Sequence, residues 1–116
     1  MIILKIGGSS LTNKDSSTSE VNFESLKRIA FEIKSSLDNS AKELIIVHGA
    51  GSFGHPPAKK YKIGEVFDKS EYPQKRIGFC ETQNAVKKLN MHVCEAFIEQ
   101  GLPVVCLLYT SDAADD

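Results

Sequence analysis

The chain begins with Met1-Ile-Ile-Leu-Lys-Ile-Gly-Gly-Ser-Ser10, a nearly continuous apolar run that ends in two glycines. A short apolar run bounded by turn residues is typical of a buried strand in a parallel sheet. We therefore expect a strand over residues 1–6, with Lys5 as its one interruption. From Gly7 to Val21 the residues are polar and without periodicity, which predicts a long loop, and loops of that length are usually functional or disordered.

A helix and a second strand are expected next. Asn22 can cap the helix, and apolar residues recur at helical spacing from Leu26 to Leu37. Residues 43–47, Glu-Leu-Ile-Ile-Val, form a second apolar run that is typical of a buried strand. The order strand, helix, strand predicts a parallel pair joined by a right-handed crossover, and hence an α/β fold.

The second half of the chain is dominated by one long helix. Residues 59–72 mix charges with a glycine and predict irregular structure. The helix is expected from Pro73 to Gln100, with Gly101 as its stop. Residues 102–105 would then begin a third strand.

Composition excludes several classes of protein. The chain has 116 residues, 41% of them apolar and 25% charged, which is typical of one soluble domain. A net charge of −1 gives no pull toward nucleic acid, and no apolar run reaches the roughly 20 residues that span a bilayer. We expect a cytoplasmic protein. Its three cysteines contain no C-x-x-C pair, so no disulfide framework and no thiolate metal site is indicated; they are Cys80, Cys94 and Cys106.

The last eleven residues change character abruptly. Residues 106–116 pass from strand-like apolar sequence into a small acidic tail, and they resemble the translation of a sequencing-library adapter. We therefore expect residues 106–116 to be a non-native tail, with an ordinary acidic terminus as the alternative. Without the tail's three aspartates, the remaining residues 1–105 carry a net charge of +2.

Two glycine-rich turns each follow a predicted strand, at the sheet edge where open α/β sheets bind ligands. Without a Cβ, the backbone can approach an anion closely and present its N–H groups. The first turn, Gly7-Gly-Ser-Ser10, lies between Lys5 and Lys14, whose ammonium groups would add charge-assisted contacts to phosphate. The turn therefore predicts a polyphosphate site, and a tight turn with two solvated lysines is the alternative.

The second turn, Gly49-Ala-Gly-Ser-Phe-Gly54, matches G-x-G-x-x-G. A dinucleotide site is nevertheless disfavoured, because His55-Pro-Pro interrupts the start of the helix that such a site needs. A Walker A loop is absent. His55 could donate to a phosphate oxygen, whereas His48, at the end of the strand, is expected to hydrogen-bond to backbone. His92 is expected to be an ordinary packing or surface residue.

Three blocks of sequence resemble the amino acid kinase superfamily. Residues 1–14 resemble its opening, a strand that ends in K-x-G-G-S, and residues 83–90 resemble its substrate-side helix. The block Val47-His-Gly-Ala-Gly-Ser-Phe-Gly-His-Pro56 is similar to the isopentenyl phosphate kinases of that superfamily. The resemblance implies a three-layer αβα sandwich with a mainly parallel sheet. Residues 1–105 would be its N-terminal, phosphate-acceptor part, so that the fold is incomplete.

The resemblance also implies roles for individual residues. The catalytic residues would be Lys5, Lys14 and His55. ATP would contact Lys5, Gly7, Gly8, Ser9 and Gly51, and the acceptor would contact Gly49, Ala50, Gly54 and His55. Ala50 departs from the family pattern, because many relatives have glycine there. No residue of this chain is expected to ligate a metal.

The implied reaction converts ATP and isopentenyl phosphate into ADP and isopentenyl diphosphate, with Mg²⁺ and in a full-length homodimer. No nucleic acid or membrane partner is expected. Another kinase of the superfamily, acting on a phosphonate or a different phosphate acceptor, is one alternative. A nucleotide-binding module without turnover is the other. Because the nucleotide lobe of the family has no counterpart in these residues, we expect the 116-residue chain to be inactive and poorly stable alone.

Overall fold

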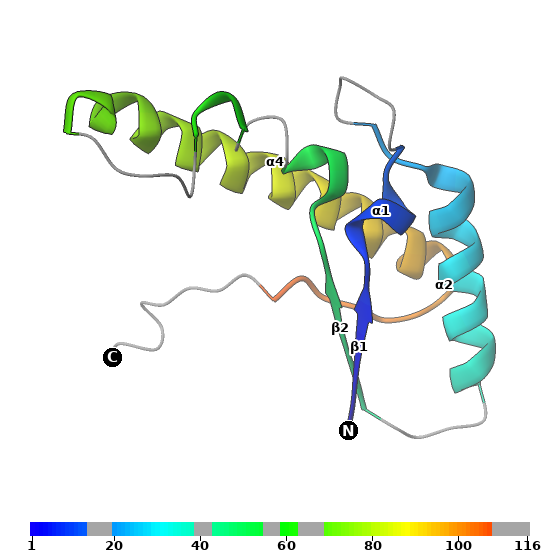
Figure 1. Ribbon diagram of the computed structural model, residues 1–116. Coiled ribbons are helices and arrows are strands. Elements are labelled where there is room, and N and C mark those ends of the chain that lie inside the picture. Colours follow the sequence, from blue (N-terminus) through cyan, green and yellow to red (C-terminus); the bar gives the residue numbers. More distant parts are fainter. Residues whose placement is uncertain (14–19, 39–42, 55–58, 63–68, 108–116) are drawn as a thin grey trace, which may run out of the picture.

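The computed structural model describes residues 1–13, 20–38, 43–54, 59–62 and 69–107. Their order is β1 (Ile2–Ile6), α1 (Gly8–Leu11), α2 (Phe23–Leu37), β2 (Leu44–His48), the short 3-10 helices η1 (Gly51–Phe53) and η2 (Lys69–Glu71), and α4 (Tyr72–Glu99) (Figure 1). The α/β class expected from the sequence is confirmed.

The two strands form a parallel pair, as the order of elements predicts. Ile2 lies opposite Leu44, and Ile6 lies opposite His48. The Gly49 N–H continues the ladder by donating to the carbonyl oxygen of Ile6 over 3.1 Å. Because the strands end together, the glycine-rich turns that follow them lie at the same edge of the sheet.

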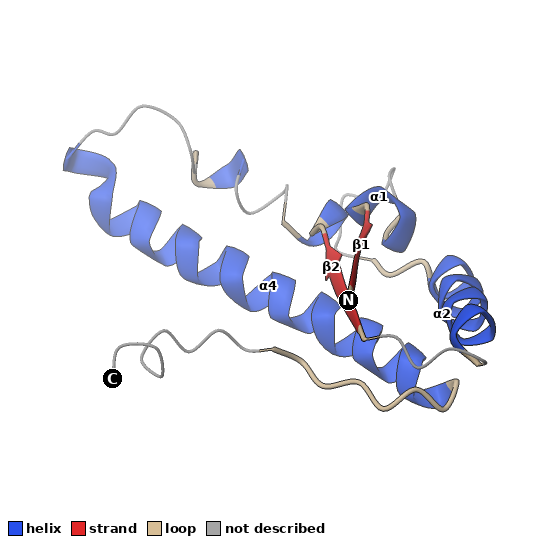
Figure 2. Ribbon diagram, turned by 90° about the horizontal axis from the view of Figure 1, so that it is seen from below, coloured by secondary structure: helices blue, strands red, loops and turns tan. Residues whose placement is uncertain are grey.

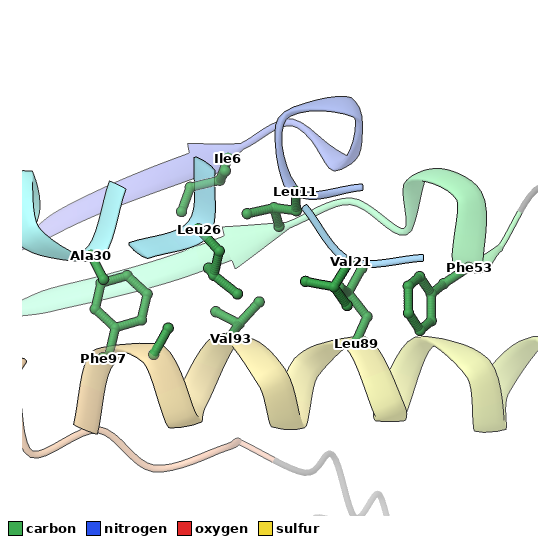
Figure 3. Packing of buried hydrophobic residues seen from close by; sticks show 10 residues of the cluster. Ile6, Leu11, Val21, Leu26, Ala30, Phe53, Leu89, Val93 and Phe97 are labelled. Atoms are coloured by element: carbon green, nitrogen blue, oxygen red, sulfur yellow. The ribbon is translucent and has the colours of Figure 1, made fainter. Parts of the chain in front are cut away.

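Two long helices form the core with the strands. Helix α4 passes across one face of the strands, and α2 lies on the side of β1 (Figures 1 and 2). The core side chains come from β1, α1, α2, η1, α4 and the segment before α2 (Figure 3), namely Ile6, Leu11, Val21, Leu26, Ala30, Phe53, Leu89, Val93, Ala96 and Phe97. This core holds the glycine-rich edge against α4 through Phe53.

The helix boundaries follow the signals in the sequence. The Asn22 side chain accepts a hydrogen bond from the Ser25 N–H over 3.1 Å, which confirms the expected cap of α2. Pro73 is the second residue of α4, where its missing N–H costs no helical hydrogen bond. The N–H of Gly101 donates to the carbonyl oxygen of Ile98 over 2.8 Å just beyond the end of α4. None of the helices in the described ranges could span a membrane.

The loop predicted for residues 7–21 is wrong in part. Residues Gly8–Leu11 form α1, and Thr12 pairs with Val21 in an isolated antiparallel bridge. The bridge is extended by hydrogen bonds from the Asn13 N–H to the Glu20 carbonyl and from the Asn22 N–H to the Leu11 carbonyl. The local sequence carries no sign of these contacts because they depend on residues on the far side of the loop.

The third strand predicted over residues 102–105 is also wrong. Pro103 has no N–H to donate, and the Val104 N–H donates to the carbonyl oxygen of Leu102 over 2.9 Å, which bends the chain locally. Residues 103–107 line a cavity of about 440 Å³ together with residues of β2 and α4, and Val104 packs against the core without pairing with β2. In the described ranges the sheet therefore has two strands.

Burial of both strands was expected, but one sheet face is open in the described part of the chain. Strand side chains alternate between faces, so Ile6 points to the core while Ile3 and Val47 point away. Ile6 is 7% exposed, whereas Ile3 is 65% and Val47 is 47% exposed. The helices that the structure describes cover one face, which leaves an apolar face uncovered, as expected for an incomplete sandwich.

Candidate functional site

The two glycine-rich turns are in direct backbone contact. A Cβ atom on Gly8 would collide with the backbone nitrogen of Gly51 and would lie 2.9 Å from the carbonyl carbon of Gly49. Only glycine fits at position 8 without moving one turn away from the other. The structure therefore brings residues 7–9 and 49–51 together, although they are far apart in the sequence.

The second turn needs glycine at position 51 for a further reason. Gly51 has φ of +51°, in the left-handed region that side chains disfavour. This conformation starts η1, which directs Phe53 into the core beside Val21 and Leu89 (Figure 3). Phe53 is 6% exposed, so it anchors the turn on α4.

His48 links the second turn to α4 through both of its ring nitrogens. Its Nδ1 lies 2.9 Å from the carbonyl oxygen of Gly49, and its Nε2 lies 2.8 Å from Nδ2 of Asn90 on α4. These contacts are satisfied together when Nδ1–H donates to Gly49 and Nε2 accepts from Asn90. The hydrogen bond to backbone expected for His48 is confirmed. The ring of His48 thus ties the turn to α4.

Lys5 is exposed on the open face of β1, next to Val47 on β2. Strand alternation places Lys5 and Ile6 on opposite faces, so the ammonium group lies away from the core. Within the described ranges Lys5 takes part in no salt bridge. Its charge is therefore not neutralised by a described carboxylate.

The predicted site residues gather as the sequence led us to expect, with two outside the described residues. One edge of the sheet brings together Lys5, Gly7, Gly8, Ser9, Gly49, Ala50, Gly51 and Gly54. Lys14 and His55 lie outside the described residues. The individual roles of all ten residues stay predictions.

Sequence reasoning missed two residues of this edge, Thr12 and Asn90. Thr12 bonds to both turns, and Asn90 holds His48. Neither residue carries a motif of its own. The position of Asn90 on α4, in the same block that resembles a substrate-side helix, was the one available signal.

The other candidate groups have ordinary surroundings. Burial, with a smaller contribution from the neighbouring Cys106, raises the pKa of the Cys94 thiol, which keeps it protonated. His92 contacts the Phe23 ring edge to face, with ring centres 5.5 Å apart. No cluster of three potential metal ligands occurs among the described residues.

Comparison with known proteins agrees with this geometry. The model of the amino acid kinase family matches residues 1–111. The isopentenyl phosphate kinase of Methanothermobacter thermautotrophicus is 50% identical over 108 residues, which are 92% of this chain and 40% of that protein. The isopentenyl phosphate kinase of Methanocaldococcus jannaschii is 41% identical over 113 residues, 92% of this chain and 42% of that protein.

A solved isopentenyl phosphate kinase structure superposes with a TM-score of 0.80 at 49% identity, over 89% of this chain and 41% of that one. The chain thus spans about 40% of the length of the curated relatives it matches. The family match covers nearly all of the residues and agrees with the parallel strand pair and its two glycine turns. The chain belongs to the amino acid kinase family.

Proposed function

We propose that this chain carries the N-terminal, phosphate-acceptor part of a kinase that transfers the γ-phosphoryl group of ATP to isopentenyl phosphate. The observation that carries the proposal is the backbone contact between the turns at Gly8 and Gly51. In the sequence, the second turn and the following His55 make up the G-S-F-G-H block, and similar proteins at 50% and 41% identity are named isopentenyl phosphate kinase.

Phosphoryl transfer requires the protein mainly to position the two phosphates and to neutralise their negative charge. An oxygen of the acceptor phosphate attacks the γ-phosphorus of ATP, the bond to the bridging oxygen breaks, and ADP leaves with that electron pair. Such a transfer is accelerated by fixing both phosphates in line and by neutralising the charge that spreads over the oxygens. Two adjacent glycine-rich turns, with a cation beside them, suit this task. The N–H groups of Gly49, Ser52, Phe53 and Gly54 donate within the protein and so hold the second turn in shape.

The first turn is assigned mainly to the donor, and the second turn mainly to the acceptor. Gly7, Gly8 and Ser9 would hold the phosphates of ATP, with the exposed Lys5 ammonium at the transferring group. Gly51 would also contact ATP. Gly49, Ala50 and Gly54 would hold the acceptor phosphate, and the apolar side chains of α4 would lie against the prenyl tail. His55, directly after Gly54 in the sequence, would donate a hydrogen bond to the acceptor phosphate. Lys14 would add a second positive charge.

Mg²⁺ would not be held by the described residues of these turns. They offer amide and hydroxyl groups and one ammonium group, whereas Mg²⁺ prefers carboxylate and phosphate oxygens. We therefore assign no Mg²⁺ ligand to the described residues, and Mg²⁺ would be carried by the phosphate oxygens of ATP. A homodimer, a cytoplasmic location and a non-native tail at residues 106–116 stay predictions.

The proposal is tested with a chimera in which residues 1–105 replace the matched segment of the Methanothermobacter relative. We expect the chimera to convert isopentenyl phosphate and ATP into isopentenyl diphosphate and ADP, with a strong preference over phosphonate acceptors. The 116-residue chain alone and the remainder of the relative alone are the controls, and neither should form product. A preference for a phosphonate, or ATP binding without transfer, would contradict the proposal.

A further inference from the structure

Thr12 is the one buried polar residue in the described part of the chain. It is 3% exposed, at the end of α1, among side chains that are otherwise apolar. A hydroxyl group removed from water needs a partner, and a single hydroxyl can both donate and accept. The buried hydroxyl of Thr12 must therefore have hydrogen-bond partners within the protein.

The hydroxyl of Thr12 joins the two glycine-rich turns. Oγ1 donates to the carbonyl oxygen of Gly8 over 3.0 Å, and it accepts from the N–H of Ser52 over 3.1 Å. Thr12 and Ser52 are 40 residues apart in the sequence. One side chain thus bonds to the first turn through its proton and to the second turn through its lone pair.

Thr12 itself is held firmly. Its backbone pairs with Val21 in the antiparallel bridge, and the neighbouring Glu20 N–H approaches Oγ of Ser52 at 3.5 Å. A Cβ on Gly51 would collide with Oγ1 of Thr12, so the hydroxyl fills the space beside that glycine. Neither turn can shift against Thr12 without losing a hydrogen bond or making a collision.

We propose that Thr12 is a positioning residue that fixes the spacing between the donor turn and the acceptor turn. This inference rests on the proposed function, in which the two turns hold the two phosphates. Thr12 touches neither phosphate. It acts through Gly8 and Ser52, and its loss lets the turns separate, which lowers the rate of transfer more than the binding of either substrate.

The test uses three variants of the active chimera. Thr12→Val keeps the shape and removes the hydroxyl, whereas Thr12→Ser keeps the hydroxyl. Ser36→Ala is the matched control, because the Ser36 hydroxyl also donates to the carbonyl four residues earlier, Glu32, over 2.9 Å but lies exposed on α2. Two readouts are compared: steady-state kinetics, and hydrogen exchange of the Ser52 amide.

For Thr12→Val we expect kcat to fall about tenfold or more while both KM values change little, since one buried hydrogen bond on each turn is lost. Exchange at Ser52 should accelerate. Thr12→Ser should restore most of kcat and most of the protection of the Ser52 amide, and Ser36→Ala should change neither kcat nor that exchange rate. Thr12→Val with unchanged kcat and unchanged Ser52 exchange would overturn the proposal, as would a fall in stability without a fall in kcat. If the parent chimera lacks kinase activity, the proposed function fails, and Ser52 exchange alone then decides whether Thr12 holds the turns.

Discussion

Gly8→Ala is expected to lower kcat/KM of the chimera about a hundredfold or more, because a misplacement of roughly 1 Å at a reacting centre costs that much. The added Cβ would collide with the backbone nitrogen of Gly51 and lie within 3 Å of Gly49, where backbone and not a flexible side chain must move. The turns would separate, and the phosphates that we propose they hold would separate with them. Kinetics with ATP and isopentenyl phosphate measure the loss.

Gly7→Ala provides the matched control for folding. Gly7 has φ of −65° and ψ of 140°, which alanine adopts readily, and its added Cβ would approach nothing closer than Oγ of Ser9 at 4.0 Å. Thermal unfolding should show a lower melting temperature for Gly8→Ala and almost none of that loss for Gly7→Ala. Full activity in Gly8→Ala would show that contact between the turns is not needed for transfer.

His55→Ala should remove a charge-assisted hydrogen bond to the acceptor phosphate. Such a bond contributes about 2 to 3 kcal/mol, so kcat/KM for isopentenyl phosphate is expected to fall about 30- to 150-fold. His55 lies outside the described residues, and the prediction rests on its place directly after Gly54 and on the family resemblance. The measurement is kcat/KM for isopentenyl phosphate at saturating ATP.

A second variant distinguishes the hydrogen bond that His55 donates from the size of its side chain. His55→Gln keeps a side-chain N–H donor and should recover part of the lost activity, whereas KM for ATP should stay near that of the parent in both variants. Unchanged kcat/KM in His55→Ala would remove His55 from the mechanism. A rise in KM for ATP alone would show that His55 acts at the donor site and not at the acceptor site.

The two long helices, α2 and α4, were predictable because their signals are local. Asn22 caps α2 by bonding to Ser25 three residues away, and Pro73 and Gly101 mark the ends of α4. The absence of the third strand could not be foreseen from its apolar residues, because a strand requires backbone pairing, and the Val104 N–H bonds to Leu102 instead. The open face of the sheet also could not be foreseen from the apolar residues of the strands. A continuous apolar run indicates burial on both faces without saying which part of the protein covers each.

The site was predictable in its glycines and less so in its supports. The two turns could be assigned to one sheet edge because parallel strands end together, and Gly8 and Gly51 lie there as expected. Thr12 could not be recognised, since its two partners include an amide 40 residues away. Its sequence context is an ordinary polar segment, and only the folded backbone makes its hydroxyl a link.

The central claim is that the first turn holds the donor phosphates and the second turn holds the acceptor phosphate. The most direct measurement is a crystal structure of the chimera with isopentenyl phosphate and a non-hydrolysable ATP analogue. The account predicts the γ-phosphate against the N–H groups of residues 7–9, and the acceptor phosphate against residues 49–55, with an acceptor oxygen in line with the γ-phosphorus. Both phosphates on one turn, or either phosphate away from this sheet edge, would contradict it.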